Sequence, residues 1–175
     1  MGKLSDNKFI PKDFLYSDIN DRINLLSGLL DTDGYISKDG HNIQYYTTSK
    51  QLKDDFCELV NGLSGVCRVK ERIGKYKDKN SIIKECLTCY VINVSLPSSM
   101  IPFKLSRRLE RFKPRTKYQP IRMFKKVEFV GYELAQCIKV NSKDSLYLTD
   151  NYIVTHNTLT ALQTAISSNC KKILI

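Results

Sequence analysis

The chain has 175 residues, enough for one or two domains with a hydrophobic core, and its 42% hydrophobic content argues against disorder. No apolar run approaches the ~20 residues that a membrane span needs, and residues 1–8 lack the apolar core of a signal peptide. We therefore expect a cytoplasmic protein with no membrane partner, whose six cysteines are reduced.

The net charge of +10 comes from one segment. Residues 66–126 hold 17 Lys and Arg against 4 Asp and Glu, which gives +13. Residues 1–65 hold 7 against 10, or −3, and residues 127–175 hold 4 against 4. Positive charge concentrated in this way favours a nucleic-acid partner, and the alternative is a solvated cationic face that keeps the protein soluble.

The first part of the chain predicts seven elements in chain order. Ser17 or Asp18 can cap a helix that runs to about Leu30, because the apolar residues between them follow helical spacing. Thr48, followed three residues later by Gln51, is a capping-box pattern for a second helix. The full order is helix 18–30, strand 35–37, strand 43–46, helix 49–63, strand 66–76, strand 82–96 and helix 99–112.

After Pro114 and Pro120 the composition changes, and we place a domain boundary near 114–125. Residues 126–140 are β-rich, residues 141–144 predict a turn, and residues 146–148 and 152–154 alternate like strands. Residues 159–167 have the pattern of an amphipathic helix, and an apolar strand begins at 172. The chain therefore divides into residues 1–114, 115–157 and 158–175.

Residues 26–34 read Leu-Ser-Gly-Leu-Leu-Asp-Thr-Asp-Gly and end the first helix in two carboxylates. Ser27 and Gly28 are small enough to let another helix backbone approach closely. The carboxyl end of a helix disfavours a carboxylate unless a cation is present, so Asp33 beside free carbonyl groups predicts a Mg²⁺ site. Alternatively, the segment is a helix-terminating turn with Gly34 in the left-handed region.

This segment, from Leu26 to Gly34, and the αββαββα order over residues 18–112 resemble the LAGLIDADG homing endonucleases. The resemblance implies that signature helices from two units pack together, that Asp33 binds a catalytic divalent metal, and that Thr32 adds its backbone carbonyl. The metals activate water for phosphodiester hydrolysis. Because one signature supplies half a site, we expect either a homodimer through the helix of residues 26–34 or a second unit on another chain.

In that family the sheet lies in the major groove of double-stranded DNA, so the strands at 35–47 and 66–96 would contact bases and phosphates. The resemblance also implies a basic residue near the metal. The residues that we expect to serve these DNA-binding roles are Arg68, Arg72, Lys75, Lys84 and Lys104.

A second chemical pattern is His156-Asn157-Thr158. The side-chain amide of an Asn can attack its own backbone carbonyl, form a succinimide and cut the chain. The preceding His can polarise that carbonyl or protonate the leaving amine, and the following Thr hydroxyl can hold an acyl group as an ester.

With the strands before it, this pattern resembles the C-terminal end of inteins, and many inteins contain an inserted LAGLIDADG endonuclease. The resemblance implies a Hint splicing domain in which His156 is the penultimate His, Asn157 cyclises and Thr158 begins the C-extein. Cys137 together with Thr155 resembles the class in which that Cys starts acyl transfer. Cys137 is alternatively a buried strand residue.

The expected protein is thus α+β, with one LAGLIDADG unit followed by the β-rich C-terminal part of a Hint domain. The chain begins without an intein's first residue, so we expect a split or truncated intein that trans-splices with a complementary N-terminal intein fragment. Residues 158–175 resemble the helix and strand after a phosphate-binding loop in a helicase of the Swi/Snf or a related type, from a prokaryotic or phage host. The alternatives are an endonuclease, homodimeric or assembled with another chain, that retains a vestigial splicing segment, and an inert remnant.

Overall fold

The computed structural model describes residues 4–77, 83–117, 119–123, 126, 128–129, 138 and 140–156. The chain separates into two compact units, Met1–Arg122 and Met123–Ile175. Residues 115–122, which we assigned to the second domain, hydrogen-bond within the first unit, because Arg115 donates to Asn42 (2.6 Å) and Arg122 donates to Asn61 (3.0 Å). No helix in the described part of the chain is long and apolar enough to cross a membrane.

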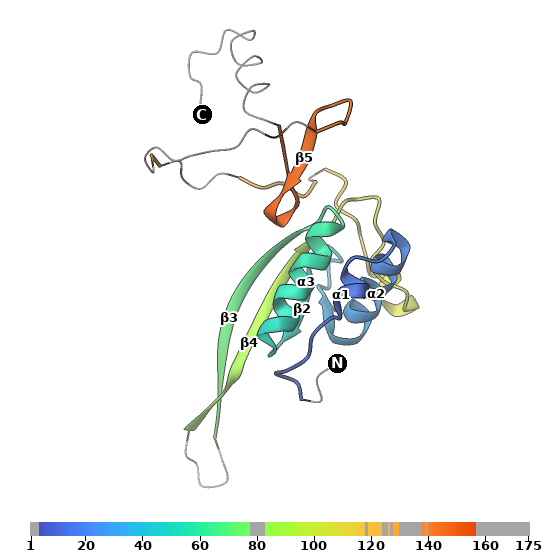
Figure 1. The fold of residues 1–175 in the computed structure, drawn as a ribbon. Helices are drawn as coiled ribbons and strands as arrows, with labels where there is room; N and C mark the ends of the chain where they lie inside the picture. Colours follow the sequence, from blue (N-terminus) through green and yellow to red (C-terminus); the bar gives the residue numbers. More distant parts are fainter. Residues whose placement is uncertain are drawn as a thin grey trace. The chain divides into compact units, whose positions relative to one another are not determined.

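The first unit is a mixed α+β fold built on one antiparallel sheet with the strand order β1-β2-β4-β3. Helices α2 and α3 pack against one face of this sheet (Figure 1). The element order agrees with the αββαββα prediction, preceded by one short helix. The elements are α1 (Lys12–Leu15), α2 (Ile19–Asp33), β1 (Gly34–Ile36), β2 (Ile43–Thr47), α3 (Lys50–Gly62), β3 (Val66–Lys77), β4 (Ile83–Ser95) and α4 (Ser106–Leu109).

Helix α2 begins at the Asp18 cap, whose carboxylate accepts a hydrogen bond from the Asn20 N–H (2.8 Å). It continues to Asp33, three residues beyond the predicted end. Gly34 follows with φ −87° and ψ 160°, which is extended backbone, so the left-handed turn considered above is wrong. Glycine is required there for another reason: a Cβ at position 34 would lie 2.4 Å from the Leu30 carbonyl oxygen.

Helix α3 is capped by Ser49 rather than by Thr48. The Ser49 hydroxyl accepts from the Leu52 N–H (3.1 Å) and donates to the Lys8 carbonyl (2.6 Å). Gln51 turns to the Asp55 carboxylate (2.7 Å) and does not complete a capping box. The prediction failed by one residue because both neighbours have hydroxyl groups.

The helix expected over 99–112 is also wrong in extent, since α4 covers only Ser106–Leu109. Met100 closes a turn onto Pro97, and Pro102 follows it. The N–H groups of Lys104 and Leu105 donate to the Asp31 carboxylate at 2.8 and 3.1 Å. These amides are therefore satisfied by a distant side chain, and the helix begins only after them.

The core lies between the sheet and its two main helices. Tyr45 of β2 and Phe56 of α3 stack with ring centroids 4.2 Å apart and planes 5° apart. Both are almost fully buried, as are Leu26 and Leu30 of α2 and Ile92 of β4. Each of these side chains stabilises the fold by about 1.5–3 kcal/mol through removal of apolar surface from water.

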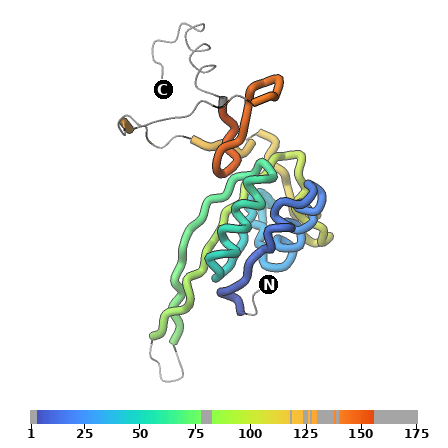
Figure 2. Tube along the Cα trace, viewed as in Figure 1, coloured from blue at the N-terminus to red at the C-terminus, as the bar shows by residue number. Residues whose placement is uncertain are grey.

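Strands β3 and β4 form a hairpin that extends beyond the helices (Figure 2). Every residue of β3 from position 68 to 77 is exposed. The register shifts between Ile73 and Lys75, at Gly74, so the hairpin has a bulge near its middle. This arm is placed by the core at its base and leaves both of its faces open along its outer part.

The second unit contains one described hairpin, β5 (Leu146–Thr149) paired with β6 (Ile153–His156), in agreement with the predicted strands. Its loop, Asp150–Tyr152, includes Asn151 at φ +58°, a conformation that Asn tolerates well. Asp144 accepts from the Leu146 N–H (3.1 Å) in the turn predicted at 141–144. Most of the predicted β-rich run at 126–140, and all of the segment 158–175, lie outside the described residues.

Candidate metal and nucleic-acid site

The two aspartates at the end of α2 have different environments. The Asp31 carboxylate accepts from two backbone amides and lies 3.8 Å from the Arg108 Nε, and both side chains are 10% exposed. Burial, followed by the charge of Arg107, lowers the pKa of Arg108, while Asp31 opposes that shift. Asp31 thus ties the end of α2 to the start of α4.

Asp33 is exposed at the last position of α2 and faces a different side. Its side chain lines a crevice of about 270 Å³ that also holds Lys8, Tyr46 and Thr48. Sequence reasoning missed Lys8, because it lies before the first helix and nothing in its spacing relates it to Asp33. Among the described residues, no hydrogen bond or ion pair occupies the Asp33 carboxylate.

The end of α2 presents the oxygen donors that a hard divalent cation prefers. The Thr32 hydroxyl donates to the Gly28 and Leu29 carbonyls at 3.0 and 3.1 Å, so its side chain is engaged within the helix. Its backbone carbonyl is then the Thr32 group that fits the predicted ligand role. No cluster of three His, Cys, Asp or Glu side chains suited to a metal occurs in the described part of the chain. One carboxylate fits a site that two units share.

The two small residues of α2 face opposite ways, which corrects the expectation for one of them. Ser27 is 1% exposed and its hydroxyl donates to the Ile23 carbonyl (2.9 Å), so it faces the unit's own core. Gly28 is exposed, and a Cβ added there would meet no atom within 4 Å. Gly28 alone marks the helix face that a second backbone could approach.

Charge at Asp33 is felt inside the core. Burial raises the pKa of Tyr45 to about 12, and the nearby Asp33 carboxylate contributes to the same shift. The stacked Tyr45 therefore stays neutral at physiological pH, and its ring forms an uncharged wall behind the end of α2.

The sheet face opposite the helices carries polar side chains in a row. Gln44 donates to Asn93 (2.8 Å), and the Asn93 amide donates to the Arg68 carbonyl (3.4 Å), across β2, β4 and β3. Tyr46 donates to Gln44 (2.5 Å) on the same face. Amide side chains of this kind read base edges, and the alternation of β2 and β4 could have signalled them.

The structure brings only some of the predicted DNA-binding residues together. Arg68 and Arg72 lie on β3 with side chains on the helix-free face, opposite Asn93 and Cys89 in register. Lys75 pairs with Glu85 (3.1 Å) on the outer hairpin. Lys84 lies opposite Tyr76 there, and Lys104 contacts Asp31 through its backbone. The crevice at Asp33 is lined by none of the three lysines.

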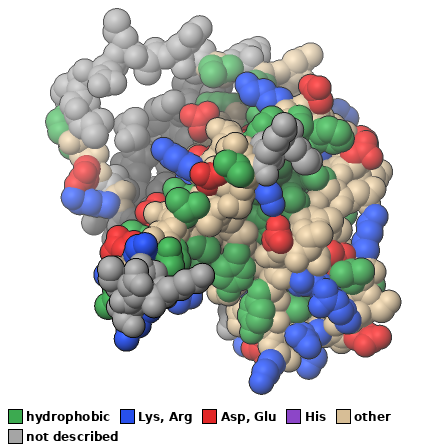
Figure 3. Space-filling model, turned by 90° about the horizontal axis from the view of Figure 1, so that it is seen from below, with side chains coloured by type: hydrophobic (Ala, Val, Ile, Leu, Met, Phe, Trp, Pro, Cys, Tyr) green, Lys and Arg blue, Asp and Glu red, His purple; other side chains and the backbone are tan. Residues whose placement is uncertain are grey.

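Figure 3 views the molecule from the distal end of the hairpin and shows Lys and Arg side chains spread over that face among hydrophobic and acidic ones. The exposed hydrophobic residues of the outer hairpin include Ile73, Tyr76, Ile83 and Leu87. A cationic arm with exposed aromatic and aliphatic groups is suited to a groove lined by phosphates.

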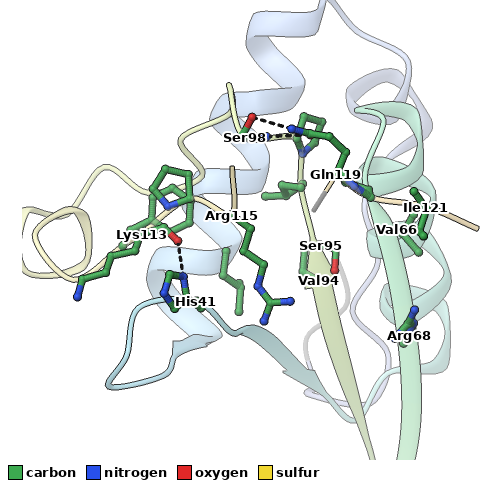
Figure 4. Close-up of a pocket in the computed structure, with 16 residues that line it drawn as sticks. His41, Val66, Arg68, Val94, Ser95, Ser98, Lys113, Arg115, Gln119 and Ile121 are labelled. Carbon is green, nitrogen blue, oxygen red and sulfur yellow. Dashed lines mark hydrogen bonds between the residues drawn. The ribbon is translucent and has the colours of Figure 1, made fainter. Parts of the chain in front are cut away.

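A second crevice, of about 180 Å³, lies where β3 begins and β4 ends (Figure 4). His41, Arg68 and Arg115 contribute to its lining, and no Asp or Glu does. Lys113 and Gln119 fasten the segment that covers it, because the Lys113 carbonyl contacts the His41 ring (3.1 Å) and the Gln119 amide donates to Ser98 (2.9 Å). This crevice continues the positive potential of β3 to the end of the sheet that is remote from the hairpin tip.

Two of the expected splicing residues lie on β6. Thr155 is opposite Tyr147, and the His156 backbone is opposite Leu146, in the last registered pair of the hairpin. Because neighbouring residues on a strand face opposite ways, Thr155 and His156 are on different faces. Cys137, Asn157 and Thr158 lie outside the described residues.

The fold and the site define a LAGLIDADG-like domain, and residues 20–95 match the sequence model of that family. The matched range begins in α2 and ends with β4, so it includes the signature helix and the whole sheet. The chain is also similar to the replicative DNA helicase DnaB of Mycobacterium intracellulare, with 29% identity over 161 residues. This alignment covers 89% of the chain but spans only 27% of the helicase's own length.

Proposed function

We propose that this chain is the C-terminal half of an intein that acts in protein trans-splicing and carries one unit of a LAGLIDADG homing endonuclease. The observation that supports this most directly is the pairing of two similarities. A LAGLIDADG-like domain occupies residues 20–95, yet 89% of the same chain aligns with a replicative helicase. An endonuclease unit within a helicase relative is the arrangement that an intein produces.

In the splicing role, β6 presents His156 and leads directly into Asn157. Asn157 cyclises and releases the intein, His156 assists as acid, and the Thr158 hydroxyl accepts the acyl group. Cys137 and Thr155 serve the first acyl transfer. The Hint domain is completed by an N-terminal intein fragment, and the host segment that begins at Thr158 belongs to a helicase of a prokaryote or phage, in its cytoplasm.

The chain should be mixed with a fragment that supplies the N-terminal half of a splicing domain, and the ligated product measured by mass spectrometry. Asn157→Ala should abolish ligation, because only the Asn side chain can form the succinimide. Asn141→Ala is the matched control, since Asn141 is exposed in the turn before β5. Ligation that survives Asn157→Ala would contradict the splicing role.

In the nuclease role, Asp33 and the Thr32 carbonyl hold Mg²⁺ together with the same groups of a second unit. Bound Mg²⁺ would supply an activated water and charge stabilisation for phosphodiester hydrolysis. Lys8 lies in the same crevice and is suited to a nearby phosphate oxygen. Arg68 and Arg72 contact the duplex from the helix-free face, while Lys75, Lys84 and Lys104 contribute charge farther from the metal.

A homodimeric endonuclease with a vestigial splicing segment is the second candidate, and the open face at Gly28 favours it. It predicts Mg²⁺-dependent cleavage of a randomised plasmid library by the chain alone. Asp33→Asn should abolish cleavage, whereas Asp13→Asn, an exposed carboxylate on α1, should not. A monomer in sedimentation experiments, with DNA binding that does not weaken as salt rises, would contradict this candidate.

A further inference from the structure

Two thiols meet at the base of the hairpin, away from the crevice that holds Asp33. Cys57 lies on α3 and Cys67 lies near the start of β3, and both are half-buried at the edge of the core. Their side chains contact each other through a thiol hydrogen bond. The remaining described cysteines, Cys86 and Cys89, lie three residues apart on β4, where side chains point to opposite faces.

The surroundings make one sulfur the stronger nucleophile. The hydrogen bond from Cys67 lowers the pKa of the Cys57 thiol, although burial opposes this, and the Lys53 ammonium one turn earlier also lowers it. The same hydrogen bond, together with burial, raises the pKa of the Cys67 thiol. A thiolate is the attacking form in disulfide exchange, so Cys57 is the residue that reacts first.

We propose that Cys57 and Cys67 are a site of reversible disulfide formation, which a low-molecular-weight disulfide such as oxidised glutathione drives, and which joins α3 to β3. This proposal rests on the packing of α3 against β3 and is independent of the proposed function. The new bond would fasten the strand that carries Arg68 and Arg72 to the helix behind it.

The reaction balances in two exchanges. The Cys57 thiolate attacks one sulfur of the small disulfide, whose S–S bond breaks, and one small thiolate leaves. Cys67 then loses its proton to solvent and attacks Sγ of Cys57, which expels the second small thiol. The two protein thiols are oxidised to one disulfide, and the small disulfide is reduced to two thiols.

The sequence provides an internal control for a test on the full chain. Trypsin leaves Cys57 and Cys67 together on peptide 54–68, and leaves Cys86 and Cys89 together on peptide 85–104. The native chain is incubated in mixtures of oxidised and reduced glutathione, free thiols are alkylated, and the peptides are weighed. Peptide 54–68 should lose about 2 Da and take no label at mixtures where peptide 85–104 still takes two labels.

Single variants test the order of attack. Cys67→Ser should accumulate glutathione on residue 57, whereas Cys57→Ser should leave Cys67 free at the same mixture. Glutathione on Cys67 in the Cys57→Ser chain would overturn the assigned order. Urea-unfolded chain should need about tenfold more oxidised glutathione to close the pair. Equal closure in native and unfolded chain, or two free thiols on peptide 54–68 when peptide 85–104 has closed, would overturn the proposal.

Discussion

Replacement of Asp31 by alanine should destabilise the first unit strongly. It removes the carboxylate that accepts from the N–H groups of Lys104 and Leu105, and it leaves the Arg108 guanidinium without its opposite charge. Removal of one partner from a buried ion pair costs about 3–5 kcal/mol. We expect the lower end, about 3 kcal/mol, because the Arg108 Nε is 3.8 Å from the carboxylate and is not hydrogen-bonded to it.

The free energy of unfolding should be measured by urea titration with far-ultraviolet circular dichroism, since the chain has no Trp. For a unit of this size, a loss of about 3 kcal/mol lowers Tm by about 10 °C. Asp33→Ala is the matched control two residues away. It should change stability by no more than about 0.5 kcal/mol, and in the stabilising direction, because it removes an exposed negative charge from a helix carboxyl end.

A double variant tests the cause. Asp31→Ala combined with Arg108→Met removes both charges, so it should recover part of the loss, whereas independent effects would add. Equal costs for Asp31→Ala and Asp33→Ala, or a double variant that is as unstable as the sum of the single variants, would refute the assignment of Asp31 as the residue that anchors α2.

Three further measurements test other parts of the unit. Gly34→Ala should cost about 2 kcal/mol or more in urea titration, because the new Cβ would lie 2.4 Å from the Leu30 carbonyl oxygen, whereas Gly28→Ala, with no atom within 4 Å, should stabilise the monomer by up to about 1 kcal/mol. Ser49→Ala should cost about 1–2 kcal/mol through loss of the α3 cap, and Thr48→Ala, whose buried hydroxyl has no hydrogen-bond partner, should cost less; the reverse ranking would restore the sequence-based assignment. The pKa of Tyr45, raised from 10 to about 12, means that the unfolded chain loses this proton first, so stability should fall by about 1.4 kcal/mol per pH unit between pH 10 and 12, and Tyr45→Phe should remove that slope.

Local patterns predicted the parts of this fold that depend on neighbours in the chain. The apolar spacing of α2, the strand alternation of β2 and the Gly40 turn at φ +82° are each set within a few residues, and each was found. The helix expected over 99–112 failed because its amides are satisfied by Asp31, more than 70 residues away. No property of residues 99–105 alone contains that contact.

The same distinction applies to the candidate site. Asp33 and Gly28 could be identified from nine contiguous residues, since a helix end and a small residue are local features. Lys8 could not, because it reaches the Asp33 crevice through the packing of the segment before α1, where Ser49 holds the Lys8 carbonyl. Ser27 was misassigned because smallness in a helix does not reveal which face is turned to the core.

The two aspartates show how one short motif serves both anchoring and chemistry. At 3.6 residues per turn, positions 31 and 33 are about 200° apart on the helix, so both cannot face the same surface. Asp31 faces the loop before α4, where two amides and Arg108 hold it, while Asp33 faces the open crevice. Because the anchor lies within one turn of the exposed carboxylate, it fixes the position of Asp33 at a helix end that would otherwise fray. A metal shared with a second unit needs that precision, since each unit contributes one carboxylate and the distance between them is set by the two helix ends.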